Sequence, residues 1–302
     1  MTGAPTVTGR PKPPEPRNRI VLWAAIAASL VILAGIDFIF FPPPSLPIAT
    51  EDAAQILAAH PAKPLYFRFR PDPSIVVIVF PTANQQSATF NRITALLLRA
   101  GTPHDRVLSD PELAAVIRTS VPFTVAHAYR AQDLVRFFRL MSLDHVAPNP
   151  DERRLHLLLG VLHWFAPGAV GAIVALGPSD QAARASLLSH ALANAAYFVS
   201  PAYAVYAEHF FHDSLTLPEQ ALFTRYLAAQ GYDTDLTGLV VNETQSLLCF
   251  TPAFDPAAIG LAPSQIQSLR TRFLQKIPLH WLKSPGALPL DPTRAWGPGP
   301  HS

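Results

Sequence analysis

A histidine and an asparagine four residues apart are the first feature of this sequence that bears on chemistry. His190 and Asn194 bound the segment His-Ala-Leu-Ala-Asn, and residues four apart on a helix lie on one face. Zinc hydrolases place the motif H-E-x-x-H on a helix because its two imidazoles then bind one metal, while the glutamate acts on the bound water. Here Ala191 stands in place of that glutamate, and Asn194 in place of the second histidine.

A later segment supplies the carboxylate that such a site needs. Zinc hydrolases of the gluzincin type take a further ligand from a glutamate on a later helix, often within the pattern N-E-x-x-[A/S]. This chain has Asn-Glu-Thr-Gln-Ser, with the glutamate at Glu243. The likeness to this pattern, together with the apolar stripe Leu187, Leu188 and Leu192 on the first helix, implies that the two helices pack together. We therefore expect His190, Asn194 and Glu243 to meet in a remnant pocket.

The order of these segments resembles that of a family of uncharacterised bacterial envelope proteins with a zincin-like site. The histidine helix is followed by a tyrosine-rich helix, by Gly-Tyr-Asp at 231–233, by the glutamate helix and by Thr-Pro at 251–252. The likeness extends upstream through NRITALLLRAG, DRVLSDPELAAVI and YRAQDLVRFFRL. It implies a zincin-like fold, with metal-ligand positions at His190 and Glu243.

The departures from the family pattern fall on the chemistry itself. A catalytic zinc usually has three protein ligands and a water molecule, and a base must take the proton of that water. His190 and Glu243 are two ligands, and alanine at position 191 is no base. We therefore predict no catalytic residues, no metal and no cofactor. The expected function is that of a pseudopeptidase, a metallopeptidase-like domain that binds a peptide or another envelope protein without cutting it.

A relocated set of zinc ligands is the alternative. His209 and His212 stand three residues apart, and so on one side of a helix. Together with His190 and Glu243 they would hold zinc in a metal-dependent hydrolase. An envelope scaffold without any cleft function is a third possibility, and metal content distinguishes the first two.

Composition argues against nucleic acid as a partner. The 302 residues include 23 Lys and Arg against 21 Asp and Glu, and the basic residues are scattered rather than gathered in a stripe. The single cysteine, Cys249, cannot form an internal disulfide, and its apolar neighbours predict a place in the core.

An apolar run from Ile20 to Phe41 predicts a transmembrane helix, since about 20 such residues cross the hydrocarbon of a bilayer. Basic residues precede the run and acidic residues follow it, which keeps the N-terminus in the cytoplasm. A cleaved signal peptide is the alternative, but the run ends in Phe-Phe-Pro-Pro-Pro rather than in a small-x-small cleavage site. We expect a single-pass protein of the bacterial inner membrane, with its C-terminal domain in the periplasm.

The fold class predicted for the exported part is α+β, a zincin-like domain with a small sheet and a mainly helical C-terminal half. The predicted organisation is a basic, Pro-rich cytoplasmic tail at 1–19, the anchor at 20–41, a Pro-rich spacer at 42–63, the domain at 64–283 and a disordered tail at 284–302. Strands are expected at 65–69, 75–80, near 123–126 and at 169–176; helices are expected before Gly101 and at 111–118, 131–143, 151–165, 181–198, 202–212, 218–230, 236–250 and 264–276.

Overall fold

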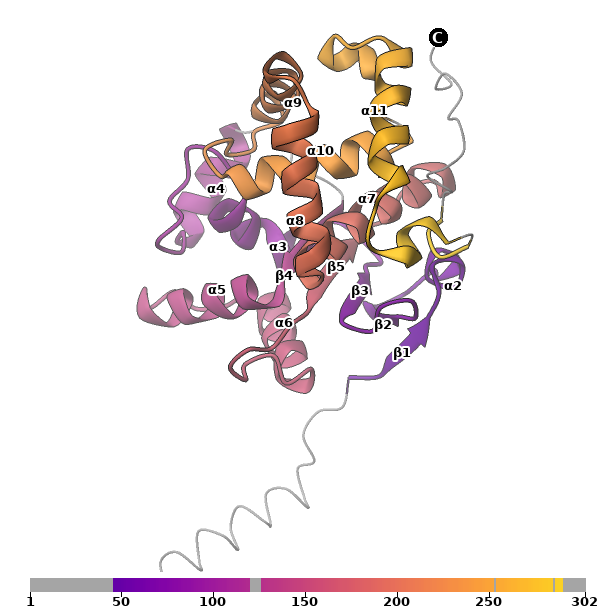
Figure 1. The fold of residues 1–302 in the computed structure, drawn as a ribbon. Helices are drawn as coiled ribbons and strands as arrows, with labels where there is room; N and C mark the ends of the chain where they lie inside the picture. Colours follow the sequence, from indigo (N-terminus) through magenta and orange to yellow (C-terminus); the bar gives the residue numbers. More distant parts are fainter. Residues whose placement is uncertain (1–45, 120–125, 253, 285, 290–302) are drawn as a thin grey trace, which may run out of the picture. The chain divides into compact units, whose positions relative to one another are not determined.

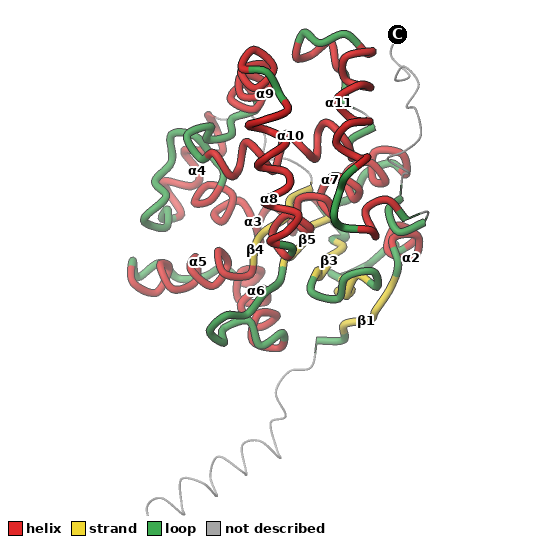
Figure 2. The backbone as a smooth tube through the Cα atoms, in the orientation of Figure 1, coloured by secondary structure: helices red, strands yellow, loops and turns green. Residues whose placement is uncertain are grey.

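A five-stranded mixed sheet lies at the centre of the fold, with helices on both sides of it (Figures 1 and 2). The structure is a computed structural model that describes residues 46–119, 126–252, 254–284 and 286–289. Across the sheet the strands are ordered β1-β2-β3-β5-β4. Their bounds are Ile48–Glu51 for β1, Leu65–Phe69 for β2, Ile75–Val79 for β3, Ala126–Arg130 for β4 and Ala172–Leu176 for β5.

The two inner strands β3 and β5 consist of apolar residues throughout. They read Ile-Val-Val-Ile-Val and Ala-Ile-Val-Ala-Leu, and every side chain of both is buried. They lie parallel to each other, β2 and β4 flank them in antiparallel pairings, and β1 pairs parallel with β2. A strand without polar residues fits only where both faces of the sheet are covered.

Alternate side chains of the sheet enter two separate hydrophobic cores. Val77 and Val174 belong to one core, and Val76 and Ile173 to the other. The α+β class predicted from the sequence is confirmed. The first core is covered by α7 (Gln181–Val199), α8 (Pro201–His209), α9 (Leu217–Ala229), α10 (Thr237–Phe250) and α11 (Pro263–Gln275), and the second by α3 (Ala83–Leu97), α5 (Ala131–Leu143) and α6 (Pro150–Val161).

The shorter elements complete the two layers of helices. They are α2 (Ala53–Ala58), α4 (Asp110–Thr119), the π-helical turn η1 (Phe210–Ser214) and the 3-10 helices η2 (Pro256–Ile259) and η3 (His280–Lys283).

Helix α7 lies on the sheet, in contact with β3, β4 and β5. Its N-cap, Asp180, accepts a hydrogen bond from the backbone N–H of Ala183 at 2.9 Å. Alanine and leucine, which favour helix, fill most of its interior. It ends at Ser200, because Pro201 has no N–H to continue the hydrogen-bond ladder and disfavours helical backbone in the residue before it.

Helix α10 crosses α7 and is buried at every residue from Val240 to Phe250. This includes five consecutive polar residues, Asn-Glu-Thr-Gln-Ser from position 242. Buried polar side chains require hydrogen-bond partners. For four of the five, those partners come from α7, α8 and α10 itself and form the site described below, whereas the buried Thr244 hydroxyl has no partner among the described residues.

The folded part begins earlier in the chain than the sequence predicts. Both β1 and α2 fall within 42–63, the predicted spacer, and β1 pairs with β2 from Ile48 opposite Tyr66 onward. Asp52 caps α2 in a capping box, and Arg184 of α7 donates to the carbonyl oxygen of Ala59 at 2.8 Å. The boundary at residue 64 is therefore corrected to Leu46, where the folded unit starts. A four-residue edge strand is too short to stand out in a Pro-rich region.

Further boundaries differ from the prediction. Strand β4 extends to Arg130, because its alternation of Ala with His127 and Tyr129 is not an apolar run; residues 123–125 of the predicted strand lie outside the described residues. The helix predicted at 202–212 divides into α8 and the π turn η1, which places both Phe210 and Phe211 against the core. The predicted tail at 284–302 also begins too early, because Leu288 is buried in the first core.

The predicted anchor, Ile20 to Phe41, lies outside the described residues. Within the part of the chain that the structure describes, no helix combines the length and the apolar character needed to cross a membrane.

Candidate functional site

Helices α7 and α10 bring three polar side chains into mutual contact. Nε2 of His190 lies 3.1 Å from Oε2 of Glu243, and Nδ2 of Asn194 lies 3.1 Å from both Oε1 of Glu243 and Nε2 of His190. We call these three side chains the polar triangle. The predicted packing of the two helices, with His190 beside Glu243, is confirmed. That the triangle is a functional site stays a prediction.

The other nitrogen of the His190 imidazole is bound as well. Nδ1 lies 2.8 Å from Oγ1 of Thr251, whose hydroxyl donates to the carbonyl oxygen of Ser246 at 2.8 Å. Because the Thr251 proton is used in that bond, Oγ1 accepts, and Nδ1 carries the proton of the His190–Thr251 bond. Nε2 then donates to Glu243 when the ring is protonated and accepts from Asn194 when the ring is neutral. The imidazole therefore has partners in both states.

The amide of Asn194 is oriented by a chain of buried hydrogen bonds. Nδ2 of Asn242 donates to the backbone carbonyl of Asn194 at 3.5 Å, which leaves its Oδ1 to accept from Nε2 of Gln245 at 3.0 Å. That Nε2 also donates to Oγ of Ser246 at 2.7 Å, and the Ser246 hydroxyl donates to Oδ1 of Asn194. Tyr203 fixes the far end by donating to Oε1 of Gln245 at 2.5 Å. The NH2 group of Asn194 is thereby turned into the polar triangle.

Little solvent reaches the polar triangle. The side chains of His190 and Glu243 are 14% and 7% exposed, and Asn194 is 3% exposed. A buried carboxylate is costly unless an opposite charge or hydrogen-bond donors compensate it. Glu243 has both when His190 is protonated, and it keeps the Asn194 donor when His190 is neutral. In surroundings of low dielectric these contacts are stronger than they would be at the surface.

These side chains do not fit the zinc site that the family resemblance implies. A catalytic zinc needs three protein donors and one open position. His190 and Glu243 offer lone pairs, but the third corner presents the NH2 group of Asn194, which has none to give. Turning this amide over would break its bond from Ser246. Among the described residues, no group of three or more His, Cys, Asp or Glu side chains stands close enough to hold a metal ion.

Position 191, where the resemblance places the general base, faces the protein core. Ala191 is fully buried and belongs to the same hydrophobic cluster as Val77 and Val174 of the sheet. Consecutive residues of a helix point about 100° apart, so Ala191 and His190 face different neighbours. A carboxylate at this position would be buried among apolar side chains.

The alternative ligands His209 and His212 are not brought to Glu243. The side chain of His209 is 72% exposed, and its Nδ1 lies 2.9 Å from Oδ2 of Asp213. His212 is exposed in the π turn, where its ring packs edge-on to Phe211. The relocated ligand set is therefore not assembled in this structure.

One buried titratable residue of the sheet was not predicted from the sequence. His127 of β4 is buried, its ring packs against that of Tyr129, and its Nε2 has no hydrogen-bond partner among the described residues. Burial lowers the pKa of His127 to about 4, against a smaller opposite effect of the Glu243 charge. Had the strand been predicted at 126–130, the alternation of a strand would have placed this histidine on the same face as Tyr129, two residues later.

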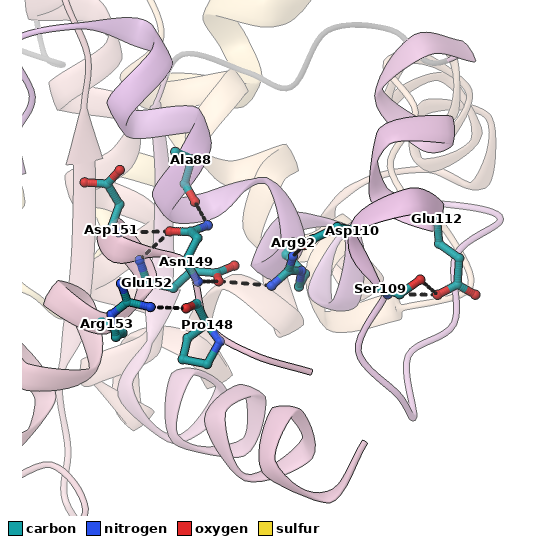
Figure 3. A network of polar contacts seen from close by, with 10 residues as sticks. All are labelled: Ala88, Arg92, Ser109, Asp110, Glu112, Pro148, Asn149, Asp151, Glu152 and Arg153. Carbon is teal, nitrogen blue, oxygen red and sulfur yellow. Dashed lines mark hydrogen bonds and ion pairs between the residues drawn. The ribbon is translucent and has the colours of Figure 1, made fainter. Parts of the chain in front are cut away.

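A second buried polar cluster lies on the opposite face of the sheet (Figure 3). Arg92 of α3 donates to Oε2 of Glu152 at 3.0 Å and pairs with Asp110 of α4. The same Oε2 accepts the backbone N–H of Asn149, whose side chain donates to the carbonyl of Ala88 at 2.8 Å. Burial raises the pKa of Glu152. These ion pairs and caps join α3, α4 and α6, and we interpret the cluster as structural.

Comparisons of the chain with protein-family models, with curated proteins and with solved structures gave no match. The resemblance to the zincin-like envelope family therefore depends on the sequence segments quoted above alone.

Proposed function

We propose that this protein is a membrane-anchored binding protein of the bacterial envelope, with a metallopeptidase-like domain that has no peptidase activity. The observation that carries this proposal is the closure of the polar triangle on itself. Asn194 donates to Glu243 at 3.1 Å, and its amide is held in that orientation by Ser246. A metal ligand at this corner would have to present a lone pair instead.

The burial of Ala191 supports the same proposal. A hydrolytic water needs a base that takes its proton, and the residue next to His190 supplies none. Because Ala191 is buried within the first hydrophobic core, a base could not be restored there without placing a carboxylate in that core. The polar triangle instead stabilises the contact between α7 and α10.

An extended peptide is the partner that we propose for this domain. Strand β4 is the last in the sheet order, so among the described residues it has a neighbouring strand on one side only. Edge strands bind extended peptides through main-chain hydrogen bonds, with side-chain pockets for specificity. β4 also packs on α7, the helix that carries His190 and Asn194, so a peptide added to β4 would pass near the polar triangle.

The proposed location follows from the run Ile20 to Phe41, which would hold the protein in the inner membrane with the domain in the periplasm. Fusion of alkaline phosphatase, which is active only in the periplasm, after Ser302 tests this topology. An active fusion that stays with the membrane after carbonate extraction is the expected result. An inactive fusion, or release by carbonate, would contradict the anchor.

Peptide binding without cleavage is tested with a library of internally quenched fluorescent peptides, added to the full-length protein in detergent with and without zinc. We expect some peptides to bind, as a rise in fluorescence anisotropy, and none to be cleaved. Cleavage that depends on Glu243 would overturn the proposed function, and the absence of any binding would remove the peptide partner.

A further inference from the structure

The imidazole of His104 lies between two groups that can only accept hydrogen bonds. Its Nδ1 is 2.5 Å from the carbonyl oxygen of Leu96, and its Nε2 is 2.8 Å from Oδ2 of Asp233. Leu96 belongs to α3, whereas Asp233 follows in the chain 129 residues after His104, in the turn before α10. The ring therefore joins two segments that are far apart in the sequence.

The proton count of this arrangement is fixed by its partners. A backbone carbonyl and an ionised carboxylate offer only lone pairs, so each bond needs a proton on the imidazole. A neutral ring carries one proton and satisfies one partner. A protonated ring carries two, satisfies both, and adds a charge opposite to that of Asp233.

Backbone contacts beside the ring hold the same two segments together. Arg99 and Tyr232 form an isolated β-bridge. The N–H of Ala100 donates to the carbonyl of Gly231 at 3.1 Å, and the N–H of Asp233 donates to the carbonyl of Leu98 at 2.8 Å. Each bond lies at the end of α3 on one side and in the Gly-Tyr-Asp turn on the other.

The charged groups around the ring are few. Arg136 of α5 donates to the backbone carbonyl of His104, Asp105 and Arg106 follow it in the chain, and the Arg99 guanidinium lies near Gly231. Oδ1 of Asp233 accepts the N–H of Asp235. The hydrogen bond from His104, followed by that from the Asp235 backbone, lowers the pKa of Asp233, so its carboxylate is ionised across the neutral range.

We propose that His104 and Asp233 form a proton-dependent latch between the end of α3 and the turn that leads into α10. The latch is complete when the ring is protonated and Asp233 is ionised. The protonated ring makes both hydrogen bonds, and one of them is lost when the ring gives up a proton on going to higher pH. Acidification strong enough to protonate Asp233 weakens the latch from the other side.

The consequence for the polar triangle rests on the proposed function, but the latch itself does not. The N–H of Leu236 donates to the carbonyl of Asp233, and α10 begins at the next residue. Glu243 lies less than two turns further along this helix. In a periplasm whose pH follows the surroundings, the latch would make the turn that precedes α10 open less often in acid than at neutral pH.

Hydrogen exchange of the full-length protein in detergent tests the latch. Protection of the amides of Ala100 and Asp233 is measured at pH 5.5 and pH 8.0, each corrected for the intrinsic exchange rate at that pH. A hydrogen bond to a charged group is worth enough to change protection about tenfold or more. We expect protection to be at least tenfold higher at pH 5.5 in the unmodified protein, and low at both pH values in His104→Gln.

The variant His209→Gln is the matched control, because it removes the exposed His–Asp pair with Asp213. It should keep the pH response of the unmodified protein. Equal protection at the two pH values in the unmodified protein, or a full pH response in His104→Gln, would overturn the latch.

A second measurement needs no variant. Nitrogen-15 chemical shifts of the His104 ring report which nitrogens carry protons. At pH 5.5 both should be protonated, with Nδ1 and Nε2 each coupled to its acceptor. A ring with a single proton at pH 5.5 would refute the latch, while zinc content and peptide cleavage would be unaffected by either outcome.

Discussion

Oε2 of Glu243 lies 3.1 Å from Nε2 of His190, although 53 residues separate the two in the sequence. The contact joins the middle of α10 to the middle of α7, and Asn194 closes it on the other side. Three polar side chains that the sequence likens to a metal site therefore satisfy one another. Stability, metal binding and pH response all follow from this arrangement in ways that can be measured.

Ser246→Ala should destabilise the protein by about 1–3 kcal/mol, because it leaves the buried Oδ1 of Asn194 without a donor. Ser189→Ala is the matched control. The Ser189 hydroxyl is equally buried on α7 and has no hydrogen-bond partner among the described residues, so its removal should change stability by less than about 0.5 kcal/mol. Urea denaturation of both variants measures the difference, and equal costs would contradict the role given to Ser246.

Asn194→His should create a third nitrogen or oxygen donor beside His190 and Glu243, and so allow zinc to bind. We expect about one zinc ion per chain in this variant after dialysis against zinc and then against buffer. Asn194→Leu, of similar size but without a donor, should retain none. Zinc retention by the leucine variant, or none by a folded histidine variant, would show that the corner is not a ligand position. Peptidase activity should not appear in either, because no base stands at position 191.

Acid should destabilise the protein through His127. Its pKa in the folded state is about 4, below the ordinary value of ~6.5, so the folded protein binds fewer protons than the unfolded chain between these values. This contribution to stability is present above the unfolded pKa and is lost as the pH falls through the folded one, and it amounts to roughly 3 kcal/mol. Denaturation at pH 7 and at pH 4 gives the free energy of unfolding at each pH. On going from pH 7 to pH 4, this free energy should fall less in His127→Phe than in the unmodified protein. An unchanged loss would mean that His127 is not the group responsible.

Arg92→Met should cost about 3–5 kcal/mol, because it leaves the buried carboxylate of Glu152 without its ion pair. Adding Glu152→Gln should recover much of this loss, since the amide keeps an acceptor for the Asn149 N–H and carries no charge. Arg154→Met is the control: its pair with Asp151 is exposed and should be worth less than about 1 kcal/mol. Thermal or urea unfolding ranks the stability of the three variants. If Arg92→Met were as stable as Arg154→Met, the ion pair between Arg92 and Glu152 would not have the structural role given to it.

The elements that carry the polar triangle were predictable because each spans enough residues to give a recognisable sequence pattern. The nineteen residues of α7 are rich in alanine and leucine and have clear ends, α10 runs for fourteen residues, and β3 and β5 are apolar runs bounded by turns. The pairing of His190 with Glu243 was expected from the resemblance to the gluzincin pattern and from the apolar stripe of the histidine helix.

The parts that were missed depend on contacts between distant segments. Strand β1 has four residues and exists because β2 is there to pair with it. His127 is buried because β4 pairs with β5 and is covered by helices, and no local pattern reveals that packing. The burial of Ala191 likewise depends on the strands and helices that surround α7, not on the spacing of its residues.

The zinc content of the full-length protein tests the central claim most directly. The protein should be purified without chelators, dialysed against zinc and then against metal-free buffer, and measured by inductively coupled plasma mass spectrometry beside Glu243→Ala. The polar triangle as described predicts far less than one zinc ion per chain in both proteins. One zinc ion per chain in the unmodified protein that disappears in Glu243→Ala would contradict the account and identify a working metal site.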